Sequence, residues 1–265
     1  MIKVLSGFTG PGGSTVAFNN LVNLFNDNGM DACLYGPQEW DGINCNFKKE
    51  EPPIGLGDTV IYHFRMPPTT RCSKLILSCH ETELFPIKNY MNSRGFYQQR
   101  LSPDAIHFVS EFQKRWHDVE GVVIPNVVSK YKPVDSNLKG PRSAAIIGSI
   151  DRNKRVHKSI QRALEDGHSD IRLYGAITDG DYFHKEVLPY LGGKVSYKGV
   201  INDMREVYNA VQDVYHSSTI ETFNLVKAEC KYANVNYHGD VESDTQAEYW
   251  PNEKILESWN TLLNQ

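Results

Sequence analysis

Short, nearly continuous apolar runs alternate along this chain with stretches whose apolar residues fall on one helical face. The first run, Ile2–Leu5, is followed by a glycine-rich turn, an amphipathic stretch ending at Asn28-Gly29, and a second run at Asp31–Tyr35. Continuous apolar runs are typical of parallel strands buried on both faces, so this order predicts a βαβ unit. We expect Ser14 or Thr15 to cap its helix. Further strands are predicted at 59–64, 74–79, 105–109 and 121–125.

The same alternation restarts in the second half of the chain. Strands are predicted at 144–147, 171–174, 194–197, 213–216 and 234–237, and helices at 155–165, 182–191, 204–209 and 224–232. Alternating strands and helices indicate an α/β protein with two doubly wound, Rossmann-like domains, which we expect to face a cleft.

The stretch between the two halves lacks apolar periodicity and contains Pro133, Gly140 and Pro141. It therefore predicts a linker at 129–143, between an N-terminal domain at 1–128 and a C-terminal domain at 144–245. The last segment, 246–265, contains apolar residues at a three-to-four spacing over 253–263. This spacing predicts an amphipathic helix that packs back on the N-terminal domain.

Composition narrows the class of protein. The chain has 265 residues, of which 40% are hydrophobic and 23% charged, as in ordinary globular proteins. The net charge of −4 excludes a wholly basic nucleic-acid binder. We find neither an apolar run of the ~18 residues that a membrane helix needs nor a signal-peptide profile. The five cysteines are scattered without a CxxC pair, so we expect no disulfide framework, no metal site and a cytoplasmic location.

The strongest chemical signal is a pair of glutamates, Glu221 and Glu229, eight positions apart. A strand is predicted before them, and a helix is predicted to start between them at Asn224, Leu225 and Val226. The amide groups and dipole at a helix N-terminus favour a phosphate. This corner therefore offers carboxylates for hydroxyl groups and amides for a diphosphate, unless it is only a capped surface helix with two solvated glutamates.

The segment from Ser218 to Glu229 is similar to the Glu-x7-Glu signature of glycosyltransferase family 4, which comprises retaining nucleotide-sugar enzymes of the GT-B fold. Five other segments resemble parts of that family in the same order along the chain: Gly12–Ser14, Val123–Asn126, Gly148–Lys154, Leu173–Gly175 and Val195–Val200. The resemblance implies a GT-B fold and a nucleotide-diphosphate sugar as the donor substrate, with no cofactor.

The resemblance also implies roles for residues of the second half. Glu221 would contact the hydroxyls of the transferred sugar, and Glu229 the ribose of the nucleotide. Lys154 would neutralise the leaving diphosphate without a metal ion, because negative charge develops on the β-phosphate. The family's arginine after the first glycine of this turn is Ser149 here, so Arg152 or Arg155 would have to replace it.

In the first half, Gly12 and Gly13 would let the backbone approach the diphosphate and the reacting sugar. His80, directly after a predicted strand, matches the family's histidine near the anomeric carbon. A structural histidine is the alternative. Glu81 and Glu83 are candidate bases for the acceptor hydroxyl.

The acceptor is suggested only by an uneven distribution of charge. Residues 59–117 carry a local charge of +4, with aromatic residues interleaved, and Arg65 and Arg94 lie within this segment. A basic, aromatic surface suits a polyanion, and compact enzymes of bacterial viruses in the wider GT-B group glycosylate hydroxymethylated bases in DNA. DNA is therefore one expected acceptor, and a saccharide or a lipid is the other.

Two other classes of protein stay open. A non-catalytic nucleotide-sugar-binding protein would explain Ser149. An NAD(P)-dependent oxidoreductase would use the glycines from Gly7 to Gly13, but their spacing differs from GxGxxG and the two glutamates would be left without a role. The sequence indicates neither the nucleotide, the sugar nor the oligomeric state.

Overall fold

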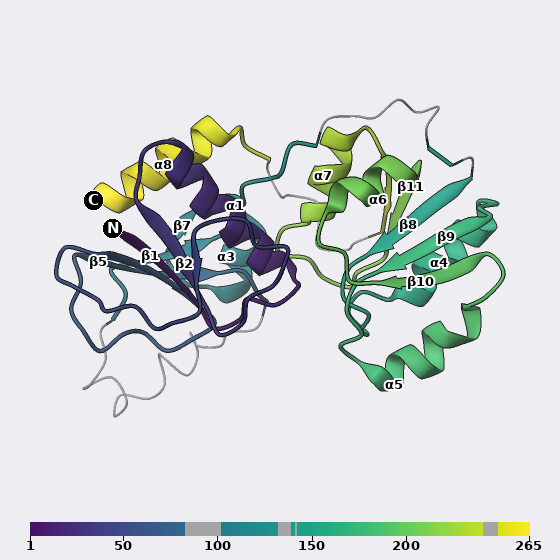
Figure 1. The fold of residues 1–265 in the computed structure, drawn as a ribbon, viewed down its shortest axis with the longest axis horizontal. Coiled ribbons are helices and arrows are strands. Elements are labelled where there is room, and N and C mark those ends of the chain that lie inside the picture. Colours follow the sequence, from purple (N-terminus) through teal and green to yellow (C-terminus); the bar gives the residue numbers. More distant parts are fainter. Residues whose placement is uncertain (83–101, 132–138, 141, 241–248) are drawn as a thin grey trace. The chain divides into compact units, whose positions relative to one another are not determined.

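The computed structural model describes residues 1–82, 102–131, 139–140, 142–240 and 249–265 (Figure 1). Its contacts divide the chain into two units. Unit 1 comprises Met1–Val127 together with Gln246–Gln265, and unit 2 comprises Val128–Thr245. The C-terminal segment thus groups with the N-terminal part of the chain, and the predicted linker groups with unit 2. The predicted cleft stays a prediction.

Unit 1 is built on a parallel sheet with the strand order β3-β2-β1-β4-β5-β6-β7. Its strands are β1 (Ile2–Ser6), β2 (Ala32–Tyr35), β3 (Phe47–Lys48), β4 (Thr59–His63), β5 (Lys74–Cys79), β6 (Ala105–Phe108) and β7 (Val122–Val123). The order reverses between β1 and β4. In doubly wound sheets, ligands bind at such a switch point, outside the carboxyl ends of the strands.

Apolar residues cover both faces of this sheet. The helices are α1 (Gly13–Asp27), α3 (Glu111–His117) and α8 (Asn252–Asn264). On one face, Phe25 of α1 lies edge-on to Trp259 of α8, with ring centroids 5.8 Å apart. Figure 1 shows α8 beside α1. The C-terminal helix therefore completes the core of unit 1 rather than standing apart from it.

Unit 2 repeats the architecture with a five-stranded parallel sheet in the order β10-β9-β8-β11-β12. Its strands are β8 (Ser143–Ile147), β9 (Asp170–Tyr174), β10 (Val195–Gly199), β11 (Asp213–His216) and β12 (Asn236–Gly239). One core cluster includes Ile160 of α4 (Val156–Glu165), and another includes Val207 of α6 (Met204–Ala210) and Cys230 of α7 (Leu225–Ala233). The two α/β sheets agree with the predicted fold class.

Local differences from the predicted elements have identifiable causes. Gly12, not Ser14 or Thr15, is the N-cap of α1, because its carbonyl already accepts the Val16 N–H at 3.1 Å. The helix predicted at 182–191 is split into α5 (Gly180–Tyr182), a π-helical turn (Phe183–Val187) and a 3₁₀ turn (Leu188–Tyr190) that contains Pro189. Proline lacks the N–H that a continuous α-helix needs.

The described residues contain no helix that is both long enough and apolar enough to cross a lipid bilayer.

Candidate functional site

The candidate site lies in unit 2, where the turns after the two central strands meet. β8 and β11 are neighbours, so the turn at 148–155 and the loop at 217–224 leave the same edge of the sheet. Gly175, directly after β9, packs closely against the turn that follows β8. A Cβ built on Gly175 would lie 1.8 Å from the carbonyl oxygen of Gly148. Its φ of +145° is also one that side-chain-bearing residues rarely adopt. Glycine is therefore needed for this packing of the strand ends.

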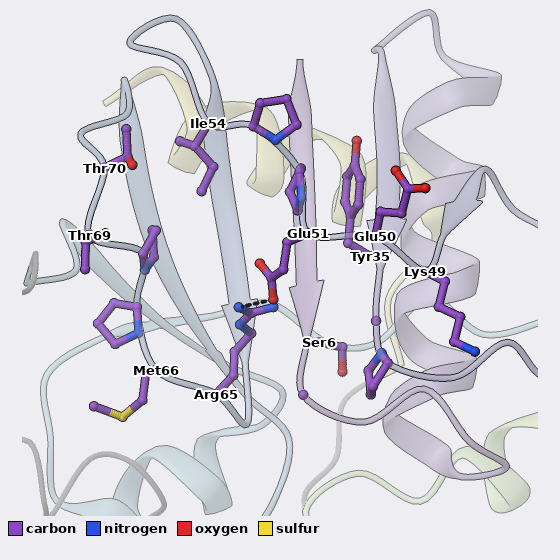
Figure 2. A pocket seen from close by; sticks show the side chains of 17 residues that line it. Ser6, Tyr35, Lys49, Glu50, Glu51, Ile54, Arg65, Met66, Thr69 and Thr70 are labelled. Carbon is purple, nitrogen blue, oxygen red and sulfur yellow. Dashed lines mark hydrogen bonds and ion pairs between the residues drawn. The ribbon is translucent and has the colours of Figure 1, made fainter.

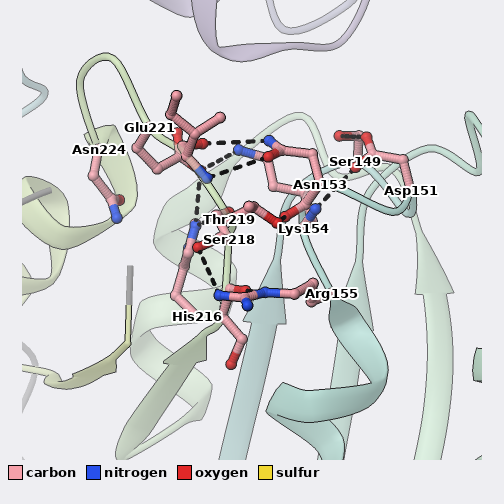
Figure 3. A network of polar contacts seen from close by, with 12 residues as sticks. Ser149, Asp151, Asn153, Lys154, Arg155, His216, Ser218, Thr219, Glu221 and Asn224 are labelled. Atoms are coloured by element: carbon pink, nitrogen blue, oxygen red, sulfur yellow. Dashed lines mark hydrogen bonds and ion pairs between the residues drawn. The ribbon is translucent and has the colours of Figure 1, made fainter. Parts of the chain in front are cut away.

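Lys154 and Glu221 form an ion pair at this edge, between Nζ and Oε1 (Figure 3). The same carboxylate oxygen lies 2.9 Å from Nε2 of His216, the last residue of β11. The side chains of Lys154 and Glu221 are 22% and 12% exposed, so the pair is largely shielded from water but reachable from one side. The structure thus brings together the two residues predicted to act on the donor.

The charge of Glu221 is fixed by its partners. Burial alone would raise the pKa of its carboxyl, but the positive charge of Lys154 and the hydrogen bond from His216 outweigh burial and hold this pKa well below its usual range. The side chain is therefore ionised at neutral pH. An ionised carboxylate only accepts hydrogen bonds, which suits the binding of hydroxyl groups rather than proton transfer.

The loop before Glu221 is held by two residues of the opposite turn. The Asn153 carbonyl accepts the Thr219 N–H at 2.7 Å, and the Asn153 side chain exchanges two hydrogen bonds with the Ile220 backbone. The Arg155 guanidinium donates to the carbonyls of Ser217 and Ser218 at 2.6 and 3.1 Å. Arg155 thus acts as a support for the loop in this structure.

The turn at 148–154 carries its own anion. Asp151 accepts hydrogen bonds from the Ser149 hydroxyl at 2.5 Å, the Lys154 N–H at 2.9 Å and the Thr178 hydroxyl at 3.2 Å. Arg152, the other candidate replacement for the family's arginine, pairs with Asp179 at 2.9 Å, and its side chain is exposed. Of these two arginines, Arg155 is therefore the one that contacts the loop leading to Glu221.

Helix α7 begins where the sequence predicts it. Asn224 is its N-cap: the side-chain oxygen accepts the Lys227 N–H at 2.9 Å, and the amide nitrogen donates to the Tyr237 hydroxyl at 2.7 Å. The Leu225 N–H is directed to the Phe223 carbonyl at 3.0 Å. The three predicted phosphate-binding positions thus form the N-cap and the first two residues of α7.

Glu229 has an orientation that differs from the prediction. It is only 3% exposed, and its Oε2 accepts a hydrogen bond from the Tyr208 hydroxyl of α6 at 2.7 Å. Burial raises the pKa of its carboxyl to about 7, although hydrogen bonds from Tyr208 and Tyr131 oppose this rise. Its contact with the nucleotide ribose stays a prediction, and in this structure the carboxyl is buried against α6. Glu229 therefore lies on the face of α7 that is turned towards α6.

His80 is also an interior residue. It is 7% exposed and its ring packs at a tilt against that of Phe18, with ring centroids 4.5 Å apart. Its Nε2 is 3.1 Å from the hydroxyl of Ser78, and the rings of His63 and His107 lie 5.1 and 6.1 Å away. Burial, followed by the neighbouring histidines, lowers its pKa well below the usual value. This placement favours the structural alternative over contact with a sugar.

The predicted glycine loop of unit 1 leads into α1. Gly12 is its N-cap and Gly13 its first residue, so both lie at the carboxyl edge of β1. A cavity of about 700 Å³ lies at the same edge, along the ends of β1, β2 and β4 (Figure 2). Its lining includes Lys49, Glu51 and Arg65, and Arg65 donates to Glu51 at 2.6 Å. This cavity was not predicted, although Gly7 of the glycine-rich turn and Arg65 of the basic segment line it.

Of the four acceptor-side candidates, the structure describes Glu81 and Arg65. The Glu81 carboxylate lies 3.9 Å from Nε2 of His63 and is about half exposed. Glu83 and Arg94 lie outside the described residues. Within the basic segment, Arg65 pairs with Glu51 and Lys114 with Glu120, so two of its cations already have acidic partners.

His216, Asn153 and Asp151 are members of the site that the sequence analysis missed. The available signal was positional: His216 ends the strand that precedes Glu221, and the other two precede Lys154 in the turn. Among the residues that the structure describes, no group of three or more His, Cys, Asp or Glu side chains is arranged to hold a metal ion.

Comparison with known structures gives the fold. The chain is similar to AviGT4, a glycosyltransferase involved in avilamycin A biosynthesis, at 17% identity and a TM-score of 0.61, covering 90% of this chain and 78% of that one. It is also similar to HepE of Anabaena in complex with UDP-glucose, at 11% identity and a TM-score of 0.63, covering 99% and 90%. A third neighbour is sucrose-phosphate synthase of Thermosynechococcus elongatus, at 12% identity and a TM-score of 0.64, covering 100% and 90%.

Comparison of the sequence with protein-family models and with curated proteins finds no match. At these low identities the structural likeness establishes the fold shared with these glycosyltransferases, and the function has to be argued from the site.

Proposed function

We propose that this chain is a retaining glycosyltransferase of the family 4 type, which transfers a sugar from a nucleotide-diphosphate sugar to an acceptor hydroxyl. The observation that carries the proposal is the Lys154–Glu221 pair beside the first turn of α7. It places one cation, one ionised carboxylate and a helix N-terminus at a single edge of the unit 2 sheet. The fold shared with structures described with UDP-glucose supports the same conclusion.

In the proposed reaction, the donor's diphosphate competes with Glu221 for Lys154. The Lys154 ammonium then neutralises the charge that develops on the β-phosphate as the bond to the sugar breaks. Glu221 stays ionised and accepts hydrogen bonds from the sugar hydroxyls, while the Val226 amide and the α7 dipole favour the phosphate. We propose that Lys154, Glu221 and the N-terminus of α7 stabilise the reacting donor without a metal ion.

The proposed ribose contact of Glu229 requires a change in this structure. Its carboxyl would have to turn away from Tyr208, or the ribose would have to reach it beside α6. We keep this role as part of the proposal, and the protonation of Glu229 in the unliganded chain is tested below.

The test is a binding and turnover screen of the purified chain with UDP-glucose, GDP-mannose, ADP-glucose and NADH. We expect a thermal shift with at least one nucleotide sugar, and release of its nucleotide when an acceptor is supplied. NMR of the product is expected to show the donor's anomeric configuration, and EDTA is expected to leave the rate unchanged. A shift with NADH alone would overturn the proposal, and binding without nucleotide release with any acceptor would favour the non-catalytic alternative.

For the acceptor, we propose DNA with hydroxymethylated bases as the first candidate to be tested. The support is the basic, aromatic segment at 59–117, two of whose cations, Arg65 and Lys114, pair with acidic residues outside it. Mass spectrometry of such DNA after incubation with the active nucleotide sugar is expected to show a gain of one or more hexose or pentose units. A gain on an oligosaccharide or a lipid, and none on DNA, would select the alternative acceptors.

A further inference from the structure

His216 is a buried imidazole in direct contact with the carboxylate proposed to hold the sugar. It ends β11 and is 5% exposed. Its Nε2 lies 2.9 Å from Oε1 of Glu221 and 2.7 Å from the hydroxyl of Ser218, and its backbone carbonyl accepts the Asp240 N–H at 3.1 Å. Both the ring and the backbone of His216 are therefore held in place.

The hydrogen-bond direction follows from the charge of Glu221. An ionised carboxylate has no proton to give, so the shared hydrogen must sit on Nε2 of His216. The bond is thus donated by the imidazole to Oε1, the oxygen that also receives Lys154 (Figure 3).

The two partners of Glu221 differ in how easily they can leave it. Lys154 has a long side chain that is 22% exposed, and a diphosphate carries more negative charge than one carboxylate. His216 is short, buried and anchored at a strand end. When a diphosphate draws Lys154 away, the imidazole is the partner that stays.

We propose that His216 is a positioning residue that keeps Glu221 in its sugar-binding orientation while Lys154 engages the diphosphate. This inference rests on the proposed function. It predicts that the sugar contributes to donor affinity only when position 216 can donate a hydrogen bond to Glu221. The affinity for the nucleotide part of the donor is expected not to depend on that bond.

The experiment compares His216→Gln with His216→Asn. Both replacements are neutral amides, but only the longer glutamine can place its N–H where Nε2 lies. Isothermal titration gives Kd for UDP and for UDP-glucose with the wild type, both variants and a control, His184→Asn, which changes an exposed histidine away from the site. Circular dichroism checks that each variant is folded.

We expect the wild type, His184→Asn and His216→Gln to bind UDP-glucose about tenfold more tightly than UDP, the effect of one charge-assisted hydrogen-bonding group. His216→Asn is expected to lose this ratio while its Kd for UDP stays within about twofold. Equal ratios in the two variants at position 216 would overturn the inference and leave the proposed function standing. A wild type that binds both ligands equally would also overturn it. A wild type that binds no nucleotide of the screen would overturn both.

Discussion

The surroundings of the two glutamates of the motif shift the pKa values of their carboxyls in opposite directions. Glu221 is kept ionised by Lys154 and His216, whereas burial beside Tyr208 raises the pKa of Glu229 to about 7. One carboxyl is therefore a permanent acceptor, and the other can be neutral near physiological pH. The same residue type serves two different purposes, because the cation lies next to only one of them.

Replacing Lys154 by alanine tests the charge proposed to act on the diphosphate. We expect Lys154→Ala to bind UDP with less than a tenfold loss in Kd but to lose about a hundredfold or more in turnover, since the charge on the leaving group grows in the transition state. Lys158→Ala is the matched control, because it removes an exposed lysine from the neighbouring helix α4. Equal rates in the two variants would remove Lys154 from the mechanism.

Replacing Glu229 by glutamine tests its buried carboxyl. The folded-state pKa of about 7 lies above the ordinary value of 4.5, so the folded chain binds the extra proton between these values and stability falls as pH rises. Relative to Glu229→Gln, the wild-type free energy of unfolding is expected to fall by about 2 kcal/mol from pH 5 to pH 8. Urea unfolding at several pH values measures this difference. Parallel pH profiles of the two proteins would show that Glu229 does not titrate in this range.

At the scale of elements, α7 joins a structural cap to the proposed phosphate site. Asn224 satisfies the Lys227 N–H and bonds Tyr237, so it fixes where the helix starts. Asn224→Ala removes the cap and is expected to cost about 1 kcal/mol of stability, with little change in the Kd for UDP. Asn224→Asp keeps the capping oxygen but adds a negative charge at the helix N-terminus.

We therefore expect Asn224→Asp to keep its stability to within about 1 kcal/mol while its Kd for UDP rises about tenfold through repulsion of the diphosphate. Uridine, which lacks phosphate, serves as the control ligand and is expected to bind unchanged. If Asn224→Asp binds UDP as the wild type does, the diphosphate does not lie at this helix terminus.

The elements themselves follow from local patterns wherever the pattern is strong. The strand predicted at 74–79 matches β5, and the strand at 213–216 matches β11, because buried parallel strands leave continuous apolar runs. The two-residue strand β3 and the helix α3 were missed, since Phe47-Lys48 is too short to show a period and α3 is a seven-residue helix. Predicted boundaries are wrong where the backbone conformation of a turn residue sets the end of an element. Asn234, with a φ of +52°, ends α7, so β12 starts at Asn236 and not at the predicted residue 234.

The part of the site that motif spacing and sheet topology determine was predictable from the sequence. Strand ends at one edge of a parallel sheet bring Lys154 and Glu221 together, and both are named by the family resemblance. The orientations of Glu229 and His80 were not predictable, because they depend on partners distant in sequence, Tyr208 in one case and Phe18 in the other. A motif gives the identity of a residue, and packing decides where its side chain points.

At the scale of the whole molecule, the buried histidines of unit 1 and the buried Glu229 of unit 2 make stability depend on pH in opposite directions. Unit 1 buries His63 and His107, and burial lowers the pKa of each to about 4. The backbone hydrogen bonds that these rings make to Ser78 and Ile124 oppose that shift only in part. Unit 2 buries Glu229, which favours the folded state at lower pH. Acidification should therefore weaken unit 1 before unit 2.

The loss of unit 1 stability on acidification follows from the unfolded chain, in which histidine takes up a proton near pH 6.5. Between pH 6.5 and 4 the unfolded state binds more protons than folded unit 1, so its stability is complete above this range and is lost within it. At pH 5 the loss is about 2 kcal/mol for each of the two histidines. All four tryptophans, Trp40, Trp116, Trp250 and Trp259, belong to unit 1, and the ring of Trp259 lies 4.6 Å from that of His107.

Tryptophan fluorescence thus reports unit 1 alone, whereas far-ultraviolet circular dichroism reports both units. At pH 8 we expect the urea midpoints of the fluorescence and dichroism transitions to be similar. At pH 5 we expect the fluorescence midpoint to fall below the midpoint of the dichroism transition. His107→Gln keeps an amide for the Ile124 carbonyl and does not titrate, so it should recover about 2 kcal/mol, the share of one histidine. Midpoints that stay together at both pH values would mean that the two units unfold as one, with the proton uptake of the histidines spread over the entire chain.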